Sequence, residues 1–227
     1  MNTESADGFC LRIFLTQDIV FLCLTSYNMN TIMIFGSANY GIKVLQTKVP
    51  ENLQKGREMK ETIQIAGRIK HSSVNGPGVR YVLFLQGCPH RCPDCQNPET
   101  WDPEKGETIL IRDIIKEIKE TRYLDGLTLS GGDPFLQPEE AAAVAEAFRE
   151  EGKDVWCYTG YTWEELLEQN KVPNAKRLLE TIDILVDGKF QRDEADPELL
   201  YRGSRNQRLI NVKLSLIDHN PKIYQEG

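Results

Sequence analysis

The sequence predicts an α/β protein built as a partial, open β/α barrel with a mainly parallel sheet. After Met59, apolar runs typical of buried strands alternate with amphipathic segments of helical period. Short turns rich in glycine and polar residues follow the apolar runs directly. The strand–helix units are too few to close a complete eight-fold barrel. With 227 residues, 40% of them hydrophobic, the chain can bury one sizeable core.

The expected strands differ in their apolar pattern, from a continuous apolar run to a loose alternation of apolar and polar residues. Residues 81–85 (YVLFL) form a continuous apolar run before Gly87, which is typical of a strand buried on both faces. Residues 62–70 alternate loosely, so we expect an edge strand there, and 209–217 alternate weakly enough to predict a last strand. The other expected strands span residues 126–130, 155–158 and 182–186.

Three helices are expected between these strands. Residues 112–123 carry isoleucines at helical spacing. Residues 138–151 begin with proline and two acids and continue through an alanine-rich body, as helices commonly do. Thr162 and Glu165 have the spacing of a capping box, which predicts a helix that continues to about residue 170.

Residues 1–58 are expected to be a non-native or disordered N-terminal extension, and residues 59–227 to be the working domain. The apolar stretch 9–24 contains charged residues, is too short to span a bilayer and lacks the basic start of a signal peptide. Residues 54–58 (QKGRE), just before Met59, correspond to purine-rich codons like those of a ribosome-binding site. Translation would then start at Met59; a genuine but poorly ordered extension is the alternative.

The overall composition narrows the class of protein. A formal net charge of −7 argues against a nucleic-acid partner, because such binding depends on lysine and arginine. The six cysteines do not have the spacing of a disulfide framework. We therefore expect a cytoplasmic protein with neither a membrane nor a nucleic-acid partner.

Three cysteines, Cys88, Cys92 and Cys95, lie in one eight-residue stretch with the spacing CxxxCxxC. Four thiolates close a tetrahedral metal site, whereas three leave one position vacant. The spacing fits an iron–sulfur cluster; zinc, and free thiols or a disulfide, stay open as alternatives. The candidates for a fourth zinc ligand are His90, His71 and Cys157, while Cys10, Cys23 and Cys157 have no partner spacing.

Other candidate binding segments follow the expected strands. Gly131 and Gly132 could bring backbone carbonyls close to a ligand ammonium group, with Asp133 adding negative charge, although an ordinary turn is the alternative. The glycines of the segment 75–80 (NGPGVR) would likewise allow the backbone to lie close to a ligand or a partner chain, or they could form a tight turn. Residues 187–190 and 202–207, which include Arg202, Asn206 and Gln207, could hold a carboxylate or hydroxyl groups, or form solvated loops.

Taken together, these motifs resemble the radical S-adenosylmethionine family, and within it the activating enzymes of glycyl-radical enzymes. The order NGPGVR, strand, CPHRCPDCQNPETW, LSGGDP carries the resemblance over residues 75–134. Later segments are similar to the activating enzymes of anaerobic ribonucleoside-triphosphate reductases: YTGY (158–161), VDGKF (186–190) and RGSRNQ (202–207).

The resemblance implies the cofactors and the reaction. Cys88, Cys92 and Cys95 would hold a [4Fe-4S] cluster as its metal ligands. The S-adenosylmethionine site would be formed by the residues Asp94, Cys95, Gln96, Gly131, Gly132 and Asp133. Reductive cleavage of S-adenosylmethionine would give a 5′-deoxyadenosyl radical. This radical would take hydrogen from a glycine of the class III reductase and leave a glycyl radical.

The resemblance also implies two partners: the glycyl-radical subunit of the reductase and a reduced flavodoxin- or ferredoxin-like electron donor. Arg80, His90 and Arg91 could offset the thiolate charge and guide an acidic donor. The alternatives are an activating enzyme of the pyruvate formate-lyase type and a non-catalytic zinc-binding interaction module.

Two departures from the family pattern bear on this expectation. Asp94 stands where many radical enzymes have an aromatic residue, so stacking on adenine is not available there. Residues 187–189 are Asp-Gly-Lys where the pyruvate formate-lyase activators usually have Asp-Leu-Lys, which favours the reductase activators.

Overall fold

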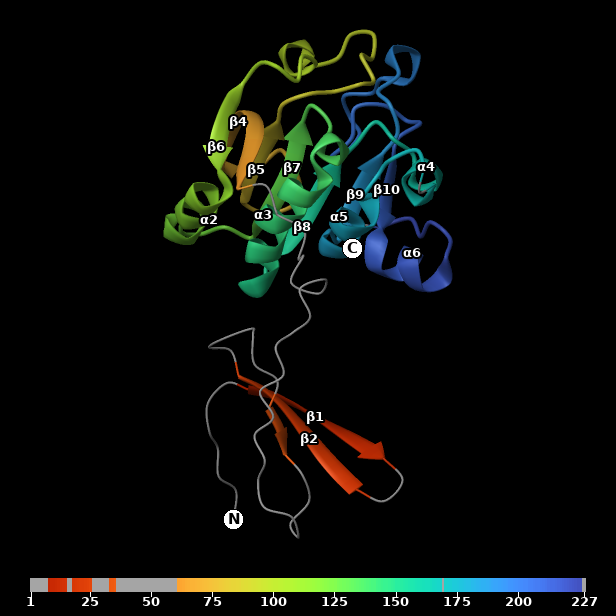
Figure 1. The fold of residues 1–227 in the computed structure, drawn as a ribbon. Helices are drawn as coiled ribbons and strands as arrows, with labels where there is room; N and C mark the ends of the chain where they lie inside the picture. The colour runs from red at the N-terminus through yellow and green to blue at the C-terminus, as the bar shows by residue number, and fades with distance from the viewer. Residues whose placement is uncertain (1–7, 16–17, 26–32, 36–60, 169, 226–227) are drawn as a thin grey trace. The chain divides into compact units, whose positions relative to one another are not determined.

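The computed structural model describes residues 8–15, 18–25, 33–35, 61–168 and 170–225. The chain divides into two compact units, Met1–Glu58 and Met59–Gly227. In the first unit, three strands pair antiparallel in the order β1-β2-β3 (Figure 1): β1 (Gly8–Leu15), β2 (Asp18–Thr25) and β3 (Met33–Phe35). The prediction that residues 1–58 are a non-native or disordered extension stays a prediction.

The second unit contains a seven-stranded sheet with the order β10-β9-β8-β7-β5-β4-β6. Its strands are β4 (Thr62–Ser72), β5 (Arg80–Leu85), β6 (Glu107–Leu110), β7 (Gly126–Gly131), β8 (Asp154–Tyr158), β9 (Ile184–Asp187) and β10 (Arg208–Asn211). The four central strands β5, β7, β8 and β9 run parallel, whereas β4, β6 and β10 pair antiparallel. The α/β class is confirmed, but the parallel part is confined to the middle, and the sheet is open with β6 and β10 at its edges.

Helices pack on one face of this sheet and bury the main core. In Figure 1, α2 (Ile111–Glu120), α3 (Pro138–Glu150) and α5 (Ala175–Thr181) lie together over this face. Tyr81, Leu83 and Leu85 of β5 belong to the core cluster that these helices cover, and all three are fully buried. The side chains alternate along a strand, so the residues between them face the other way.

The opposite face of the sheet carries a smaller apolar cluster. Trp156, Ile184, Val186 and Leu209 form it, and tyrosines from three segments pack against it. Alternation places Phe84 of β5, Ser130 of β7 and Tyr158 of β8 on this same face. This face, rather than the one covered by helices, is therefore the one that can hold a ligand.

Several predicted elements differ from the structure at the edges. The strand predicted at 62–70 is not an edge strand, because β4 lies between β5 and the short β6, which the sequence analysis missed. Residues of β6 are half-buried or exposed, so no apolar run marked them. The strand predicted at 209–217 ends at Asn211, whose side chain accepts a hydrogen bond from Leu214 N and caps α6 (Val212–Asp218).

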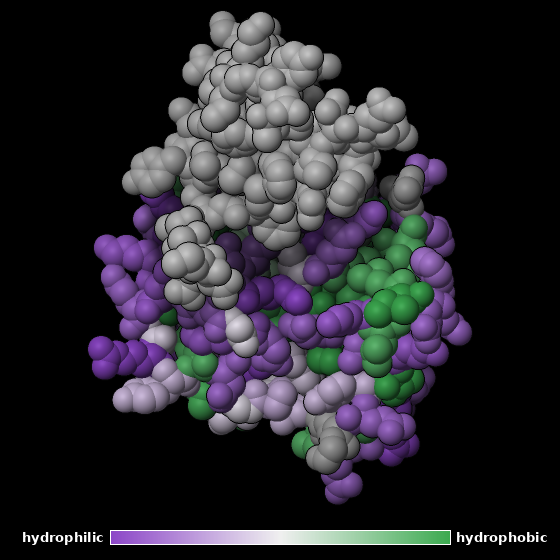
Figure 2. Space-filling view, turned by 90° about the horizontal axis from the view of Figure 1, so that it is seen from below, coloured by the Kyte–Doolittle hydropathy of each residue, from purple (hydrophilic) through white to green (hydrophobic). Residues whose placement is uncertain are grey.

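The remaining helices match the prediction in part. The capping box at Thr162 and Glu165 is confirmed, and it begins α4 (Trp163–Leu167), which ends before the predicted residue 170. The seven-residue α5 was not predicted, since its pattern is too short to show a helical period. On the side seen in Figure 2 the described surface is mostly hydrophilic with separate apolar patches. No helix among the described residues is both long and apolar enough for a membrane crossing.

Candidate active site

A cavity of about 490 Å³ lies where the central parallel strands end. Its wall is formed by the cysteine loop after β5, by Ser130–Gly132 at the end of β7, by Tyr158–Gly160 after β8, and by residues 188–190 and 199–207 after β9. These segments are far apart in sequence, but parallel strands bring their carboxyl ends to one edge of the sheet. The candidate binding segments that follow the expected strands therefore lie at this edge of the sheet.

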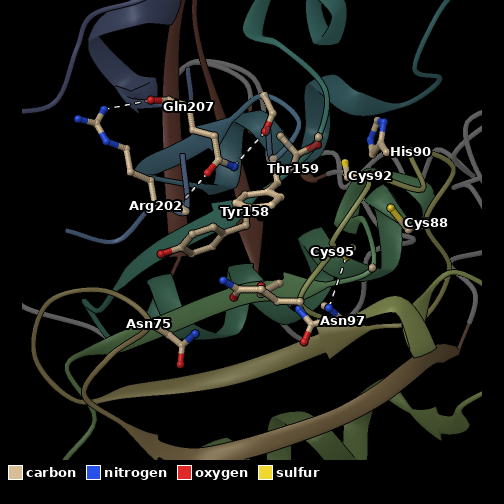
Figure 3. Close-up of a pocket in the computed structure, with 18 of the residues that line it drawn as sticks. Asn75, Cys88, His90, Cys92, Cys95, Asn97, Tyr158, Thr159, Arg202 and Gln207 are labelled. Carbon is tan, nitrogen blue, oxygen red and sulfur yellow. Dashed lines mark hydrogen bonds between the residues drawn. The ribbon is translucent and has the colours of Figure 1, made fainter. Parts of the chain in front are cut away.

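Cys88, Cys92 and Cys95 all line this cavity (Figure 3), and each is a half-buried free thiol. The loop turns through two residues with left-handed backbone, Arg91 (φ 48°) and Asp94 (φ 56°). Cys95 N donates to Cys92 O at 3.2 Å, so the last two cysteines share a tight turn. The loop thus presents three thiols to one space.

The structure also fixes both ends of this loop. Gly87 N donates to Thr100 O at 2.7 Å, and Cys88 N donates to Trp101 O at 3.1 Å. The amide of Asn97 donates to the sulfur of Cys95 at 3.4 Å. Such backbone donors to a sulfur are the kind of outer contact that stabilises a thiolate ligand.

Burial favours the protonated form of two of the thiols, Cys88 and Cys92. Desolvation raises the pKa of Cys88 to about 11, and it raises the pKa of Cys92 as well. A thiol must lose its proton to bind metal, so metal binding here would release protons. Three sulfur donors on one wall of a cavity fit an iron–sulfur cluster, whose ligands are thiolates.

The zinc alternative lacks a fourth ligand among the candidates named for it. Cys157 is fully buried in the main core, and His71 bonds through Nε2 to the carbonyl of Arg122. His90 lines the cavity, but its Nε2 bonds to Asp133 at 2.7 Å. Within the described part of the chain, no three His, Cys, Asp or Glu side chains gather around one ion-sized point.

Gly131 and Gly132 occupy positions that no side chain could share. Gly131 has a φ of 92°, and a Cβ there would lie 2.7 Å from Leu85 N. A Cβ on Gly132 would collide with the carbonyl of Gly87. Both glycines line the cavity, so no side chain separates their backbone from it.

The two predicted acidic residues lie outside the cavity wall. Asp94 is exposed and pairs with Arg192 at 2.9 Å. Asp133 is 1% exposed, and its carboxylate accepts hydrogen bonds from other segments of the chain. Gln96, by contrast, lines the cavity beside Cys95.

Figure 3 places the cysteines on one side of the cavity and Arg202 with Gln207 on the other, with Tyr158 between them. The Gln207 side chain accepts from Gly203 N at 2.8 Å and donates to Gly188 O at 3.0 Å. Gln207 thereby joins two loops of this wall. Arg202 donates to the backbone carbonyl of Gln207 at 3.0 Å.

Several residues that line the cavity were not among the candidates that the sequence motifs indicate. Tyr158 is half-buried and faces the cavity, and burial raises its pKa. Thr159 and Asn97 also lie on the wall. The position of Tyr158 at the end of a central strand was the available signal.

The electrostatic hypothesis for the three basic residues needs correction. Arg80 is 1% exposed and bonds to Asp154 at 2.5 Å near the amino end of β5, at the other end of that strand from the cysteine loop. The His90 side chain is 6% exposed and bonded to Asp133. Only Arg91 of the three is exposed, so it alone could meet an electron donor.

Comparison with known proteins agrees with this site. Residues 74–210 match the family described as a 4Fe-4S single cluster domain, and the three thiols at one cavity of an open α/β sheet fit this class of iron–sulfur protein. More narrowly, the chain belongs to the family of anaerobic ribonucleoside-triphosphate reductase-activating proteins. It is 43% identical over 151 residues to that protein of Escherichia coli K12, covering 62% of this chain and 93% of the relative.

Two further relatives carry the same description. The protein of Haemophilus influenzae is 40% identical over 149 residues, which cover 62% of this chain and 93% of the relative. That of Enterobacteria phage T4 is 36% identical over 144 residues, which cover 60% of this chain and 86% of the relative. The resemblance named from the sequence motifs is thereby confirmed at the level of the family.

Proposed function

We propose that this protein activates an anaerobic ribonucleoside-triphosphate reductase by reductive cleavage of S-adenosylmethionine at a [4Fe-4S] cluster. The observation that carries the proposal is one cavity lined by three free thiols and by the bare backbone of Gly131 and Gly132. The bound cluster would supply the electron that splits S-adenosylmethionine into methionine and a 5′-deoxyadenosyl radical. That radical would take a hydrogen atom from a reductase glycine.

The chain's own residues would bind and orient the reactants. Cys88, Cys92 and Cys95 would hold the cluster, leaving one iron without a protein ligand. The carbonyls of Gly131 and Gly132 would accept hydrogen bonds from the substrate ammonium group. Gln96 would contact the same ligand from the cysteine loop, whereas the contacts of Asp94 and Asp133 favour a supporting role for both.

The mouth of the cavity suits a polypeptide substrate. Val74 lines the cavity and is nevertheless 77% exposed, and the half-buried Leu199 lines the cavity as well. We expect a docked polypeptide to cover Val74. A loop that carries the reductase glycine would enter there, with its backbone against the polar wall.

The test of this proposal is the identity of the protein that acquires a glycyl radical. The reduced, reconstituted protein with S-adenosylmethionine should generate a glycyl radical in a class III ribonucleoside-triphosphate reductase, detected by electron paramagnetic resonance. A reductase with that glycine replaced by alanine is the control. A radical formed only in pyruvate formate-lyase would favour the alternative activating enzyme, and a colourless zinc-loaded protein would refute the proposal.

The proposal also covers the working unit of the chain, its electron donor and its location. The working unit would be residues 59–227, with residues 1–58 outside it. The electron donor would be a reduced flavodoxin- or ferredoxin-like protein, and the location would be the cytoplasm, where such donors and reductases meet.

A further inference from the structure

We propose that His90 and Asp133 form a positioning pair that fixes the cysteine loop against the backbone of Gly131 and Gly132. This inference rests on the proposed function and extends it. The pair would keep the three cysteines at a fixed distance from the backbone of Gly131 and Gly132. Neither side chain would need to touch the reacting atoms. Loss of the pair would weaken S-adenosylmethionine binding more than it weakens cluster assembly.

The first observation is that Asp133 accepts hydrogen bonds from three segments at once. Its Oδ2 bonds to His90 Nε2 at 2.7 Å and accepts from Gly160 N at 3.0 Å. The hydroxyl of Thr159 donates to both carboxylate oxygens, at 2.8 and 3.0 Å. Phe135 N donates to Oδ1 at 2.9 Å. The carboxylate therefore joins the cysteine loop to the loops after β7 and β8.

The second observation is that His90 is packed on both sides. Its ring meets the ring of Tyr161 edge-on at 4.4 Å, with the planes at 75°. On another side Gly160 lies so close that a Cβ there would collide with the His90 ring. Because the His90 ring is closely packed, a shift of the loop at residues 159–161 would displace the cysteine loop as well.

The third observation concerns the backbone between the two residues and the glycines. Asp133 N donates to Gly87 O at 2.8 Å, and Gly132 N donates to Leu85 O at 2.7 Å. Gly87 directly precedes Cys88, so the same few residues carry both the first cysteine and the contact to the glycine turn. The side-chain pair adds a second contact to Asp133 three residues further along the loop, at His90.

Asp133 itself does not line the cavity, so we assign it a positioning role and no direct contact with the ligand. A buried carboxylate with this many donors has its lone pairs occupied by the protein. It is therefore poorly placed to bind the ligand ammonium group. Removing outer partners of this kind commonly costs a metal site about 10- to 100-fold in metal affinity or in activity, and here we expect the loss in ligand binding.

The test compares variants of the full chain after anaerobic reconstitution. Asp133→Asn and His90→Leu should each assemble the cluster, measured by iron and sulfide content. Each should need about 10- to 100-fold more S-adenosylmethionine to change the electron paramagnetic resonance spectrum of the reduced cluster. His90→Gln keeps an N–H near the position of Nε2 and should restore most of the affinity.

Two comparisons exclude a general loss of stability. Tyr81→Phe removes a partly buried hydrogen bond to Glu117 on the helix-covered face, and it should leave S-adenosylmethionine binding unchanged. The double variant of His90 and Asp133 should lose no more affinity than the worse single variant, because one pair is broken only once. Additive losses, or an equal loss in Tyr81→Phe, would overturn the inference.

A second measurement needs neither cluster nor ligand. Amide hydrogen exchange in the cluster-free protein should become faster for residues 88–97 in Asp133→Asn, while β4 remains protected. Unchanged exchange in this loop would overturn the inference even if a variant failed to assemble the cluster. If the unaltered protein showed no spectral response to S-adenosylmethionine, the proposed function would fail, while the exchange result would still decide on the pair.

Discussion

At the residue scale, the three cysteines of the loop differ from Cys157, the other described cysteine, in burial and surroundings. Cys88, Cys92 and Cys95 are half-buried at a cavity, whereas Cys157 lies in the apolar core with its pKa raised by burial. A buried thiol in apolar surroundings is inert. The position of Cys157 thus supplies a control for the loop cysteines.

Replacing any one of Cys88, Cys92 or Cys95 by alanine should abolish the iron–sulfur chromophore after anaerobic reconstitution, because two thiolates cannot hold a cube. Cys157→Ala should keep the chromophore and lose only about 1 kcal/mol of stability through a small cavity. Visible absorption and iron content measure the first effect, and denaturant unfolding measures the second. Full iron content in a loop variant would contradict the assignment.

Glu164 gives a pH-dependent prediction. Hydrogen bonds from Arg208, at 2.8 and 3.1 Å, lower the pKa of Glu164 from 4.5 to about 2. The ionised form is favoured in the folded state, so its contribution is present above pH 4.5 and is lost as the pH falls toward 2. The free energies of unfolding of the unaltered protein and Glu164→Gln should therefore converge over this range. Curves that stay parallel would contradict the prediction.

The sequence could predict the cysteines and the glycines but not the contact between His90 and Asp133. Cys88, Cys92 and Cys95 carry their own spacing, and Gly131 is a local signal of close backbone approach. His90 and Asp133 are 43 residues apart, and their bond depends on how two loops pack after the sheet has formed. No pattern within either loop indicates that contact.

At the scale of elements, the buried Arg80 joins three strands at the amino end of β5. Its guanidinium donates to Thr128 Oγ1 at 3.2 Å, to Leu127 O at 2.6 Å and to Asp154 at 2.5 Å. Thr128 in turn donates to Asn75 O at 2.6 Å, and Asn75 lines the cavity. Arg80 therefore connects β5, β7 and β8 and supports the loop at the cavity wall.

Arg80→Lys should lower the free energy of unfolding by about 2 kcal/mol, because an ammonium group cannot reproduce the forked contacts of the guanidinium. Denaturant unfolding of the cluster-free protein measures this change. Arg112→Lys, at a side chain that is 78% exposed on α2, is the matched control and should change stability little. Equal stability of the two variants would show that the buried network contributes nothing.

Buried elements were easier to predict than edge elements. β5, β7 and β9 are covered on both faces, and each showed up as an apolar run. β6 and α5 escaped prediction because one is partly exposed and both are short. The sequence around Asn211 did not distinguish the end of β10 from the start of α6, since both segments are apolar.

At the scale of the whole molecule, the division at Met59 separates a compact α/β unit from residues 1–58. The residues that match the iron–sulfur family, 74–210, lie entirely in the second unit. The cysteine loop, the glycine turn and the polar wall of the cavity all come from this unit as well.

A protein that begins at Met59 should therefore fold and assemble the same cluster as the full chain. Thermal unfolding and iron content compare the two proteins directly. An insoluble product, or one without a cluster, would contradict the proposal that residues 1–58 lie outside the working unit. N-terminal sequencing of the native protein tests the start site itself, and a sequence that begins at Met1 would refute the start at Met59.

The central claim is that three thiolates hold a cluster that cleaves S-adenosylmethionine reductively. The most direct measurement is the formation of 5′-deoxyadenosine and methionine by the reconstituted, reduced protein under anaerobic conditions. We expect both products in the unaltered protein and in Cys157→Ala, and neither product in Cys88→Ala, Cys92→Ala or Cys95→Ala. A cluster-loaded protein that leaves S-adenosylmethionine intact, or a loop variant that still cleaves it, would contradict the account.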